Sequence, residues 1–511
     1  MNTSAAVEMR NISKRFGTKV QANDNVSLDI QRGEILALLG ENGSGKTTLM
    51  NMLAGIYFPD SGTIHVNGEP VVISSPRKAM ELGIGMIHQH FKLVDVLSAA
   101  ENIVLGLEGK LDLKEATRKI REICDAYGFD VDPNQKIYNM SVSQKQTVEI
   151  VKVLYRGADI LILDEPTAVL TPQETDKLFA VLRNMRDDGK TIVIITHKLN
   201  EVEALSDKVA VLRAGRYIGT LITKETNAAE MTNMMVGRAV SLDIDRPEPE
   251  KPELRMEIRD ATVRDEEGLL KLDHVSFDIY GGEILGIAGI SGAGQKELLE
   301  SIYGLQRMEE GSILFHDPDT GETAELKGKK PLQIQRMGIS LSFVPEDRLG
   351  MGLVGSMDIT DNIMLRSYRN GSYGFLNRKD PKKMARWIVT ELGVSTPGID
   401  TPVRRLSGGN VQKILVGREI VQTPRVLMMA YPVRGLDINA SYTIYQLMNL
   451  QKEKGVAVVF VGEDLDVLME LCDRILVLCG GKVSGIVDGR KADKQEIGMM
   501  MTRVGGEQDG Q

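Results

Sequence analysis

A glycine-rich loop between a predicted strand and a predicted helix is the feature that most constrains this chain. The loop is Gly40-Glu41-Asn42-Gly43-Ser44-Gly45-Lys46-Thr47, with the spacing G-x-x-x-x-G-K-[ST]. The run 34–39 before it predicts a buried strand, and the run 48–54 after it predicts a helix. Glycines let successive backbone N–H groups point at a phosphate, and the start of the helix adds positive potential. The sequence therefore predicts a phosphate-binding loop (P-loop).

Two side chains of the loop have the chemistry to bind a nucleoside triphosphate. Lys46 can reach the β- and γ-phosphates, and Thr47 can place its hydroxyl on Mg²⁺. The alternative is a glycine-rich turn that binds nothing. We reject it because the preceding strand, the lysine and the Thr47-Thr48 pair all agree with a P-loop.

Length and composition describe a large globular chain. Its 511 residues are too many for one hydrophobic core, and 42% hydrophobic with 26% charged residues is ordinary for a globular protein. No apolar run reaches about 18 residues, so no membrane-spanning helix is predicted. Residues 1–8 do not resemble a secretory signal, and the net charge of −9 argues against a nucleic-acid surface.

The sequence contains two copies of one domain. The loop at Gly40 recurs at Gly289, an offset of 249 residues (289 − 40). Further along, Met140-Ser141 recurs as Leu406-Ser407, an offset of 266 residues (406 − 140). Strand, loop and later segment keep their order in both halves, which indicates duplication rather than coincidence.

The boundary between the copies is visible in the composition. Residues 243–252 are charged and proline-rich without periodicity, which predicts an extended linker. We therefore expect a first domain over 1–240, a linker over 241–254, a second domain over 255–504 and a disordered tail over 505–511.

Further residues of the first copy suit the hydrolysis of a nucleotide. Asp164 and Glu165 end a predicted strand, where the first can hold Mg²⁺ and the second can polarise an attacking water. His197 ends another predicted strand, where it can contact the γ-phosphate. Gln89 can contact both Mg²⁺ and the attacking water. Phe16 can stack on adenine. Each has an ordinary alternative as a solvated strand end, a structural histidine or a core residue, but together and in this order they favour one site.

This order of segments resembles the ATP-binding cassette of ABC transporters, and the resemblance covers residues 5–500. It implies an α/β fold of two P-loop ABC ATPase domains. Each has a RecA-like parallel sheet core, an N-terminal antiparallel β region and an inserted helical subdomain, to which the amphipathic helix predicted over 113–127 belongs. In this family two cassettes pair head to tail, and each ATP lies between the P-loop of one and the L-S-G-G-Q signature of the other. The resemblance therefore implies an intramolecular pairing of the two cassettes.

The second copy has lost the residues on which hydrolysis depends. Gln295 stands at the position of Lys46 and Tyr431 at that of Glu165. The remaining replacements are Lys296 for Thr47, Ala430 for Asp164, Glu463 for His197, Glu346 for Gln89 and Asp265 for Phe16. We expect no hydrolysis in this pocket.

The signature segments show the opposite asymmetry. The second copy has Leu406-Ser407-Gly408-Gly409-Asn410 and keeps Gly435-Leu436-Asp437, while the first has Met140-Ser141-Val142-Ser143-Gln144. In the first copy, the side chains of Val142 and Ser143 occupy the positions at which glycines would let backbone N–H groups approach the γ-phosphate. Head-to-tail pairing then combines intact parts in one site and defective parts in the other. We predict one hydrolytic site per chain; the alternative is two weak but active sites.

The pattern and the resemblance together assign the site residues. Catalysis is assigned to Glu165, His197 and Gln89, and metal binding to Thr47, Gln89 and Asp164. ATP binding is assigned to Phe16, Gly40, Glu41, Asn42, Gly43, Ser44, Gly45, Lys46, Thr47, Thr48, Ser407, Gly408, Gly409 and Asp437.

A tandem cassette with a degenerate second half resembles the ATPases of bacterial simple-sugar importers of the ribose and galactose type. Within that group the runs 87–91 and 163–174 look like the branch that imports nucleosides, although Ser143 and Tyr431 depart from it. The resemblance implies an ATP-hydrolysing subunit that uses ATP and Mg²⁺. It also implies two integral-membrane permease subunits, an extracytoplasmic substrate-binding protein acting through them, no nucleic acid, and a peripheral position at the cytoplasmic face of the cell membrane.

Three other functions stay open at this point. The chain could import a simple sugar such as ribose or galactose. A soluble tandem-cassette factor that acts on ribosomes usually has two active sites and a long charged helical linker, which this sequence lacks. A nucleotide-dependent scaffold without hydrolysis is disfavoured by the complete set of Lys46, Asp164, Glu165 and His197.

Overall fold

The computed structural model shows two compact units, Met1–Ser241 and Leu242–Gln511. The residues that it describes are 5–17, 20–88, 91–107, 112–167, 170–237, 244–249, 252–265, 267–290, 292–343, 352–368, 376–421, 424–434, 436, 438–462 and 464–502. The predicted site residues Gln89 and Asp437 and the predicted tail 505–511 lie outside these residues.

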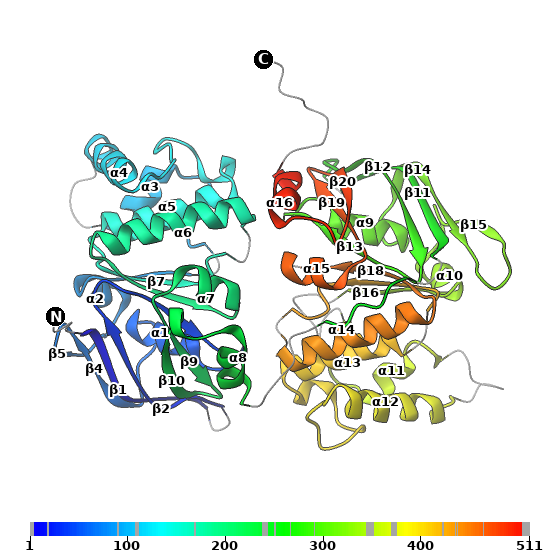
Figure 1. The fold of residues 1–511 in the computed structure, drawn as a ribbon, viewed down its shortest axis with the longest axis horizontal. Coiled ribbons are helices and arrows are strands. Elements are labelled where there is room, and N and C mark those ends of the chain that lie inside the picture. The colour runs from blue at the N-terminus through cyan, green and yellow to red at the C-terminus, as the bar shows by residue number, and fades with distance from the viewer. Residues whose placement is uncertain are drawn as a thin grey trace, which may run out of the picture. The chain divides into compact units, whose positions relative to one another are not determined.

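The first unit is built around a six-stranded sheet of order β10-β9-β3-β8-β7-β6 (Figure 1). All neighbours pair in parallel except β10, which is antiparallel to β9. The strands are β3 (Ile35–Leu39), β6 (Ile84–Ile87), β7 (Ile160–Asp164), β8 (Thr191–Thr196), β9 (Lys208–Arg213) and β10 (Arg216–Ile222). Every residue of β3, β7 and β8 is buried, as expected for parallel strands that are covered on both faces.

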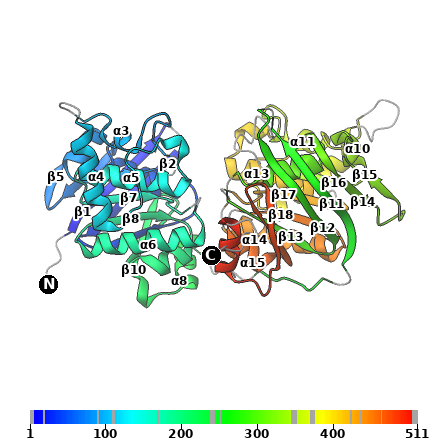
Figure 2. The same ribbon diagram turned by 90° about the horizontal axis from the view of Figure 1, so that it is seen from above.

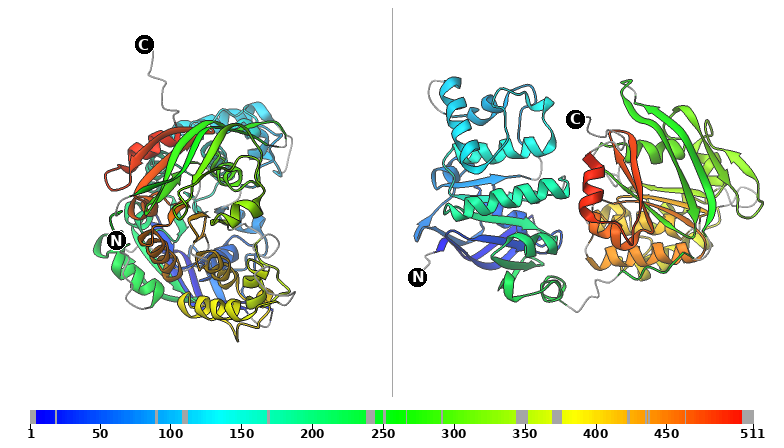
Figure 3. Two further views of the ribbon diagram at one scale, coloured as in Figure 1. Left: turned by 90° about the vertical axis from the view of Figure 1, so that its right-hand side faces the viewer. Right: turned by 45° about the horizontal axis from the view of Figure 1, so that its top comes forward.

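A smaller sheet and a group of helices lie on opposite sides of this core (Figures 1 and 3). The smaller sheet is antiparallel, with the order β2-β1-β4-β5. Its strands are β1 (Ala5–Phe16), β2 (Val20–Gln31), β4 (Ser61–Val66) and β5 (Glu69–Val71). The helical group, seen from above in Figure 2, consists of α3 (Ala99–Val104), α4 (Leu113–Tyr127) and α5 (Val142–Tyr155), which pack on one another.

The remaining α-helices of the first unit follow the sheet strands, and the last of them, α8, comes after the final strand β10. They are α1 (Lys46–Leu53), α2 (Pro76–Glu81), α6 (Pro172–Asp187), α7 (Leu199–Leu205) and α8 (Ala228–Val236). The predicted helix over 113–127 is confirmed as α4, which buries Ala116, Ile120 and Cys124 on one face. Asp112 caps its N-terminus and Gly128, with φ 77°, ends it.

The second unit repeats this design. Its sheets have the orders β16-β17-β18-β13-β19-β20 and β12-β11-β14-β15. The strands are β11 (Glu253–Arg264), β12 (Leu270–Gly281), β13 (Ile284–Ala288), β14 (Met308–His316), β15 (Thr323–Glu325), β16 (Ile339–Phe343), β17 (Val426–Ala430), β18 (Ala457–Val461), β19 (Arg474–Cys479) and β20 (Lys482–Asp488). The helices are α9 (Gln295–Ile302), α10 (Pro331–Arg336), α11 (Ile359–Met364), α12 (Lys379–Glu391), α13 (Gly408–Ile420), α14 (Ile438–Glu453), α15 (Leu465–Leu471) and α16 (Lys494–Thr502).

The predicted fold class is therefore confirmed for both halves of the chain: a parallel core sheet, an antiparallel β region and an inserted group of helices. Among the described helices, none combines the length and apolar character needed to cross a bilayer.

Residues 244–249, which fall in the predicted linker, belong to the second unit and are hydrogen-bonded to the rest of it. The side chain of Asn449 donates to the carbonyl of Asp245, and the ammonium group of Lys452 donates to the carbonyl of Pro247. We call this segment the strap. The described part of the predicted linker is thus anchored, a feature that its charged, proline-rich sequence did not predict.

The strap also caps the C-terminal end of α15, where the first unit uses a residue of its helix α6 to cap the matching helix. Arg246 Nη1 donates to carbonyls at the C-terminal end of α15, including that of Cys472 at 2.6 Å. In the first unit, Arg183 Nη2 donates to the carbonyl of Ala204 (2.6 Å) in the last turn of the matching helix α7. Asn449 stands at the position of Arg183 (449 − 183 = 266). An arginine from the strap therefore replaces one that the second copy lacks.

We expect Arg246→Ala to loosen the end of α15, because a cationic donor to the last helical carbonyls is lost. Amide hydrogen exchange of α15 in the full chain should rise about tenfold. Adding Asn449→Arg, which recreates the arrangement of the first unit, should restore protection, and Arg183→Ala should loosen α7 in the same way. Unchanged exchange of α15 in Arg246→Ala would show that the cap is dispensable.

Candidate active site

The glycine-rich loop lies where the sequence places it, between β3 and α1. Gly45 is the N-cap of α1 with φ 94°. A Cβ atom on Gly45 would lie 2.2 Å from the carbonyl oxygen of Ala22, and one on Gly40 would lie 2.3 Å from that of Leu212. Neighbouring backbone thus approaches the loop so closely that only glycine fits at these two positions.

Lys46 begins α1 and is almost fully buried, with 6% of its surface exposed. Its Nζ donates to the carbonyls of Gly40 (2.6 Å) and Glu41 (3.0 Å). Burial lowers the pKa of its ammonium group, although the charge of Glu165 opposes the shift. Beside it, Ser44 Oγ is buried and has no hydrogen-bond partner among the described residues. A phosphate group fits this cradle, because it would accept from both the ammonium and the hydroxyl.

Thr47 and Asp164 bring two oxygen atoms together at the end of β7. Thr47 Oγ1 donates to Asp164 Oδ1 at 3.4 Å. Burial raises the pKa of the Asp164 carboxyl to about 6. Hydroxyl and carboxylate oxygens are ligands that Mg²⁺ accepts alongside water and substrate phosphates, so this pair fits the predicted metal.

Glu165 and His197 form a contact between the ends of β7 and β8. His197 Nδ1 lies 2.8 Å from Glu165 Oε1. Burial alone would raise the pKa of Glu165, but the hydrogen bond and charge of His197, together with Lys46, hold it below its usual range. Glu165 has φ 47°, in the left-handed region, and its N–H donates to the carbonyl of Ile195 (2.9 Å). The sharp turn lets the carboxylate leave the strand on the side of the P-loop lysine.

The other predicted contacts of the first unit are more exposed. Phe16 is 38% exposed, and its ring packs edge-on against that of Tyr57, with 5.2 Å between the centroids. Asn42, Gly43 and Thr47 are exposed, while Thr48 is half-buried in the first turn of α1. The structure thus brings together residues of the P-loop, β7 and β8, while Gln89 and Asp437 stay predictions outside the described residues.

The described part of the matching loop in the second unit has a similar backbone but different chemistry: Gly292 and Gly294 have φ 85° and 107°, where Gly43 and Gly45 have φ 81° and 94°. Gln295 begins α9 as Lys46 begins α1, and its Nε2 donates to the carbonyl of Ile290 (3.2 Å). Tyr431 has φ 53°, like Glu165, and packs against the apolar core. The fold of a P-loop is therefore kept without its positive charge or its carboxylates.

The two signature segments begin matching helices. Ser407 is the N-cap of α13 and is followed by Gly408 and Gly409 in the first turn. In the first unit Ser141 caps α5, and side chains of Val142 and Ser143 stand at the positions of the two glycines.

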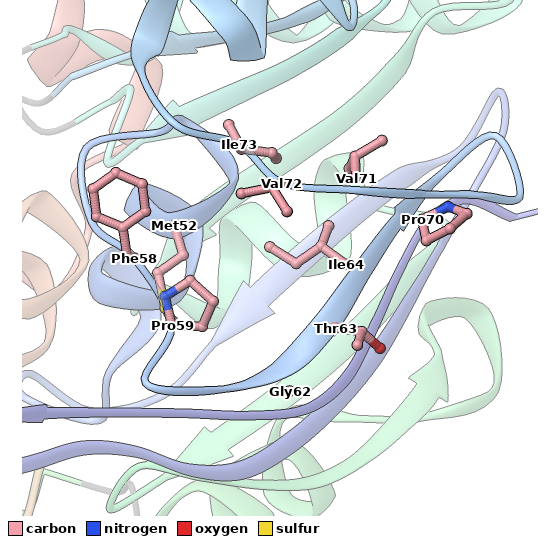
Figure 4. A pocket seen from close by; sticks show the side chains of 10 residues that line it. All are labelled: Met52, Phe58, Pro59, Gly62, Thr63, Ile64, Pro70, Val71, Val72 and Ile73. Atoms are coloured by element: carbon pink, nitrogen blue, oxygen red, sulfur yellow. The ribbon is translucent and has the colours of Figure 1, made fainter.

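An apolar pocket of about 230 Å³ lies in the first unit beside β4 and β5 (Figure 4). It is lined by Met52, Phe58, Pro59, Gly62, Thr63, Ile64, Pro70, Val71, Val72 and Ile73. No charged side chain and no residue of the P-loop lines it, so it is unrelated to the nucleotide site.

Sequence reasoning missed Glu201, a buried acid (7% exposed) in α7. Its carboxylate accepts from the hydroxyls of Thr196 and Thr167, which belong to the segments that carry His197 and Glu165. No motif marks this residue. The available signal was the comparison of the two copies, because the second has Val467 at this position (467 − 201 = 266).

A P-loop, a carboxylate pair after one strand and a histidine after the next define a nucleoside-triphosphate-binding α/β protein. A family model described as ABC transporter matches residues 23–168 and 272–433, and the chain belongs to this family. The predicted family and the enzyme class, an ABC transporter ATPase, are confirmed, and cassettes of this family bind nucleotide.

Full-length relatives support the same assignment. The chain is 42% identical to a nucleoside import ATP-binding protein, NupA, of Lactococcus lactis, covering 99% of each chain. It is also 42% identical to a guanosine import ATP-binding protein, NupO, of Bacillus subtilis, covering 97% of each. A ribose import ATP-binding protein, RbsA 1, of Rubrobacter xylanophilus is 37% identical, covering 96% of this chain and 97% of the relative.

Proposed function

We propose that this chain powers an ABC importer of nucleosides by hydrolysing ATP. The observation that carries the hydrolysis is the convergence of Lys46, Asp164, Glu165 and His197 at one edge of the first core sheet. The relatives named for nucleoside and guanosine import, at 42% identity, support the substrate class over a simple sugar, because the ribose relative is less similar at 37%. Import of a simple sugar such as ribose or galactose is the second candidate.

The partners follow from the relatives' role in import. We infer two integral-membrane permease subunits, an extracytoplasmic substrate-binding protein that acts through them, and a peripheral position of this chain at the cytoplasmic face of the cell membrane. The runs 87–91 and 163–174, which resemble the nucleoside branch, support the same choice of transporter.

The site residues of the first unit have distinct roles in the proposed mechanism. Lys46 moves its ammonium from the loop carbonyls to the β- and γ-phosphates, and Ser44 donates to a phosphate oxygen. Thr47 and Asp164 would hold Mg²⁺, which would supply positive charge against the phosphates. Glu165 accepts the proton of a water whose oxygen attacks the γ-phosphorus, while the bond to the β-phosphate oxygen breaks. His197 orients Glu165 through the 2.8 Å contact.

One hydrolytic site per chain is the form of the mechanism that the sequence favours. The first unit keeps the P-loop lysine and the carboxylates, and the second keeps the glycines after Ser407. Random decay of one copy would not preserve complementary parts in both copies. We therefore propose that Ser407, Gly408, Gly409 and Asp437 complete the site that contains Lys46, with the two cassettes paired head to tail.

We expect a nucleoside to stimulate ATP turnover when this chain is reconstituted with its two permeases and binding protein in lipid vesicles. Guanosine, adenosine, uridine and ribose, each added with the binding protein, are compared at the same concentration. Stimulation by one or more nucleosides and none by ribose is the expected result. Stimulation by ribose alone would replace the proposed substrate with a sugar while leaving the ATPase assignment intact.

A further inference from the structure

A buried carboxylate joins the two segments that carry the Glu165–His197 pair. Glu201 lies in the first turn of α7, the helix labelled in Figure 1. This helix packs on β3 and β8. Glu201 Oε2 accepts from Thr196 Oγ1 at 2.8 Å, and its Oε1 accepts from Thr167 Oγ1. Lys198 Nζ lies 3.3 Å from the same Oε1. We call the set Thr167, Thr196 and Glu201 the carboxylate bridge.

The residues of the carboxylate bridge lie next to His197 and Glu165 in the sequence, so the bridge acts on the segments that carry this pair. Thr196 directly precedes His197, and Thr167 follows Glu165 by two residues. One side chain therefore fixes the distance between the end of β8 and the turn after β7. The 2.8 Å contact of His197 with Glu165 spans the same two segments.

The second unit lacks the whole bridge. At an offset of 266 residues, Val433, Gly462 and Val467 stand at the positions of Thr167, Thr196 and Glu201 (433 − 167, 462 − 196 and 467 − 201). Val433 and Val467 pack against the apolar core of that unit. The bridge is thus present in the unit with the hydrolytic carboxylates and absent from the unit without them.

The second unit also shows that the local backbone does not need the bridge. Tyr431 adopts φ 53° and donates its N–H to the carbonyl of Val461 at 2.9 Å. Glu165 makes the matching turn with φ 47° and the matching bond to Ile195 at 2.9 Å. Since the turn forms equally well with valines and glycine, the buried acid serves something other than the turn. Burying a carboxylate costs free energy, which indicates that Glu201 has a role beyond shaping the backbone.

We propose that Glu201 is a positioning residue for ATP hydrolysis: it holds His197 and Glu165 at the separation at which the imidazole orients the base. This inference rests on the proposed function, because it assumes that Glu165 activates the water. Glu201 is buried with its two carboxylate oxygens bonded to the two threonines, so it acts through them. Its loss should therefore lower the rate of the chemical step while ATP binding, which depends on Lys46 and the glycines, persists.

The test compares Glu201→Val with the triple variant Thr167→Val, Thr196→Gly, Glu201→Val, which carries the residues of the second unit. The full chain, with its permeases, is assayed for kcat, KM for ATP and thermal midpoint. We expect kcat to fall roughly 10- to 100-fold in both variants, with KM changed less than about threefold. The triple variant should recover the thermal midpoint lost by Glu201→Val, because no buried hydroxyl is left without an acceptor.

Glu34→Val is the matched control, because Glu34 is also a buried acid of the first unit, paired with Lys208 at 2.9 Å. It should lower the thermal midpoint and leave kcat within about twofold. If the triple variant recovers kcat together with stability, or if Glu201→Val keeps the wild-type kcat, Glu201 has no positioning role. Glu165→Gln is measured alongside: retained turnover there overturns the proposed role of Glu165 as the base, on which this inference rests, whereas lost turnover with an active triple variant overturns only the role of Glu201.

Discussion

Glu165→Gln is expected to lower ATP turnover by roughly 10²- to 10⁴-fold while ATP stays bound. The carboxylate is half-buried, lies 2.8 Å from His197, and has its pKa held low by that ring and by Lys46. It is therefore ionised and oriented at neutral pH, which a base that accepts a proton from water requires. Glutamine keeps the size of the side chain but cannot take the proton, and none of the loop contacts of Lys46 is removed.

Turnover and equilibrium ATP binding of the reconstituted complex measure this effect. Glu122→Gln is the control, since Glu122 is an exposed acid of α4 paired with Arg118 on the helix surface, and we expect it to behave as wild type. A Glu165→Gln protein that keeps more than about a tenth of wild-type turnover contradicts the assignment of the base.

Lys46→Gln is expected to weaken ATP binding roughly 10- to 100-fold and to slow turnover by roughly 10²-fold or more. The substitution gives the first loop the residue that the second has at Gln295. That residue donates to the carbonyl of Ile290 at 3.2 Å, much as Lys46 donates to the carbonyl of Glu41, at the matching position, at 3.0 Å. The loop should therefore keep its fold and lose only the charge that compensates the phosphates.

Nucleotide titration and a thermal unfolding scan of the same preparation separate binding from folding. The thermal midpoint without nucleotide should stay within a few degrees of wild type, while the midpoint shift on adding ATP should shrink. Lys119→Gln, a change at an exposed lysine of α4, serves as the charge control. Undiminished ATP affinity in Lys46→Gln would mean that another group carries the phosphate contact.

The parts of the fold that the sequence predicted depend on local pattern. The P-loop, the buried strands on both sides of it and α4 each follow from residues close together in the chain, so spacing and periodicity were sufficient. The contact of Glu165 with His197 could be expected because parallel strands end at one edge of a sheet.

The parts that the sequence did not predict depend on contacts between distant residues. The bond of Thr167 to Glu201 joins positions 34 residues apart, and that of Arg246 to Cys472 joins positions 226 residues apart. Neither pair has a motif or a period. Both become visible only when the two copies are compared position by position. Asn449 in place of Arg183 points to the contact of Arg246. Val467 in place of Glu201 accompanies the loss of both threonines.

The most direct test of one hydrolytic site per chain is the turnover of the reconstituted complex with Glu165→Gln and with Tyr431→Glu. Tyr431→Glu restores a carboxylate in the second pocket, which still lacks the P-loop lysine because Gln295 replaces it. We expect Glu165→Gln to abolish turnover and Tyr431→Glu to change it less than about twofold. Turnover that survives largely intact in Glu165→Gln would show that the second pocket hydrolyses ATP and would contradict the division of labour between the two copies.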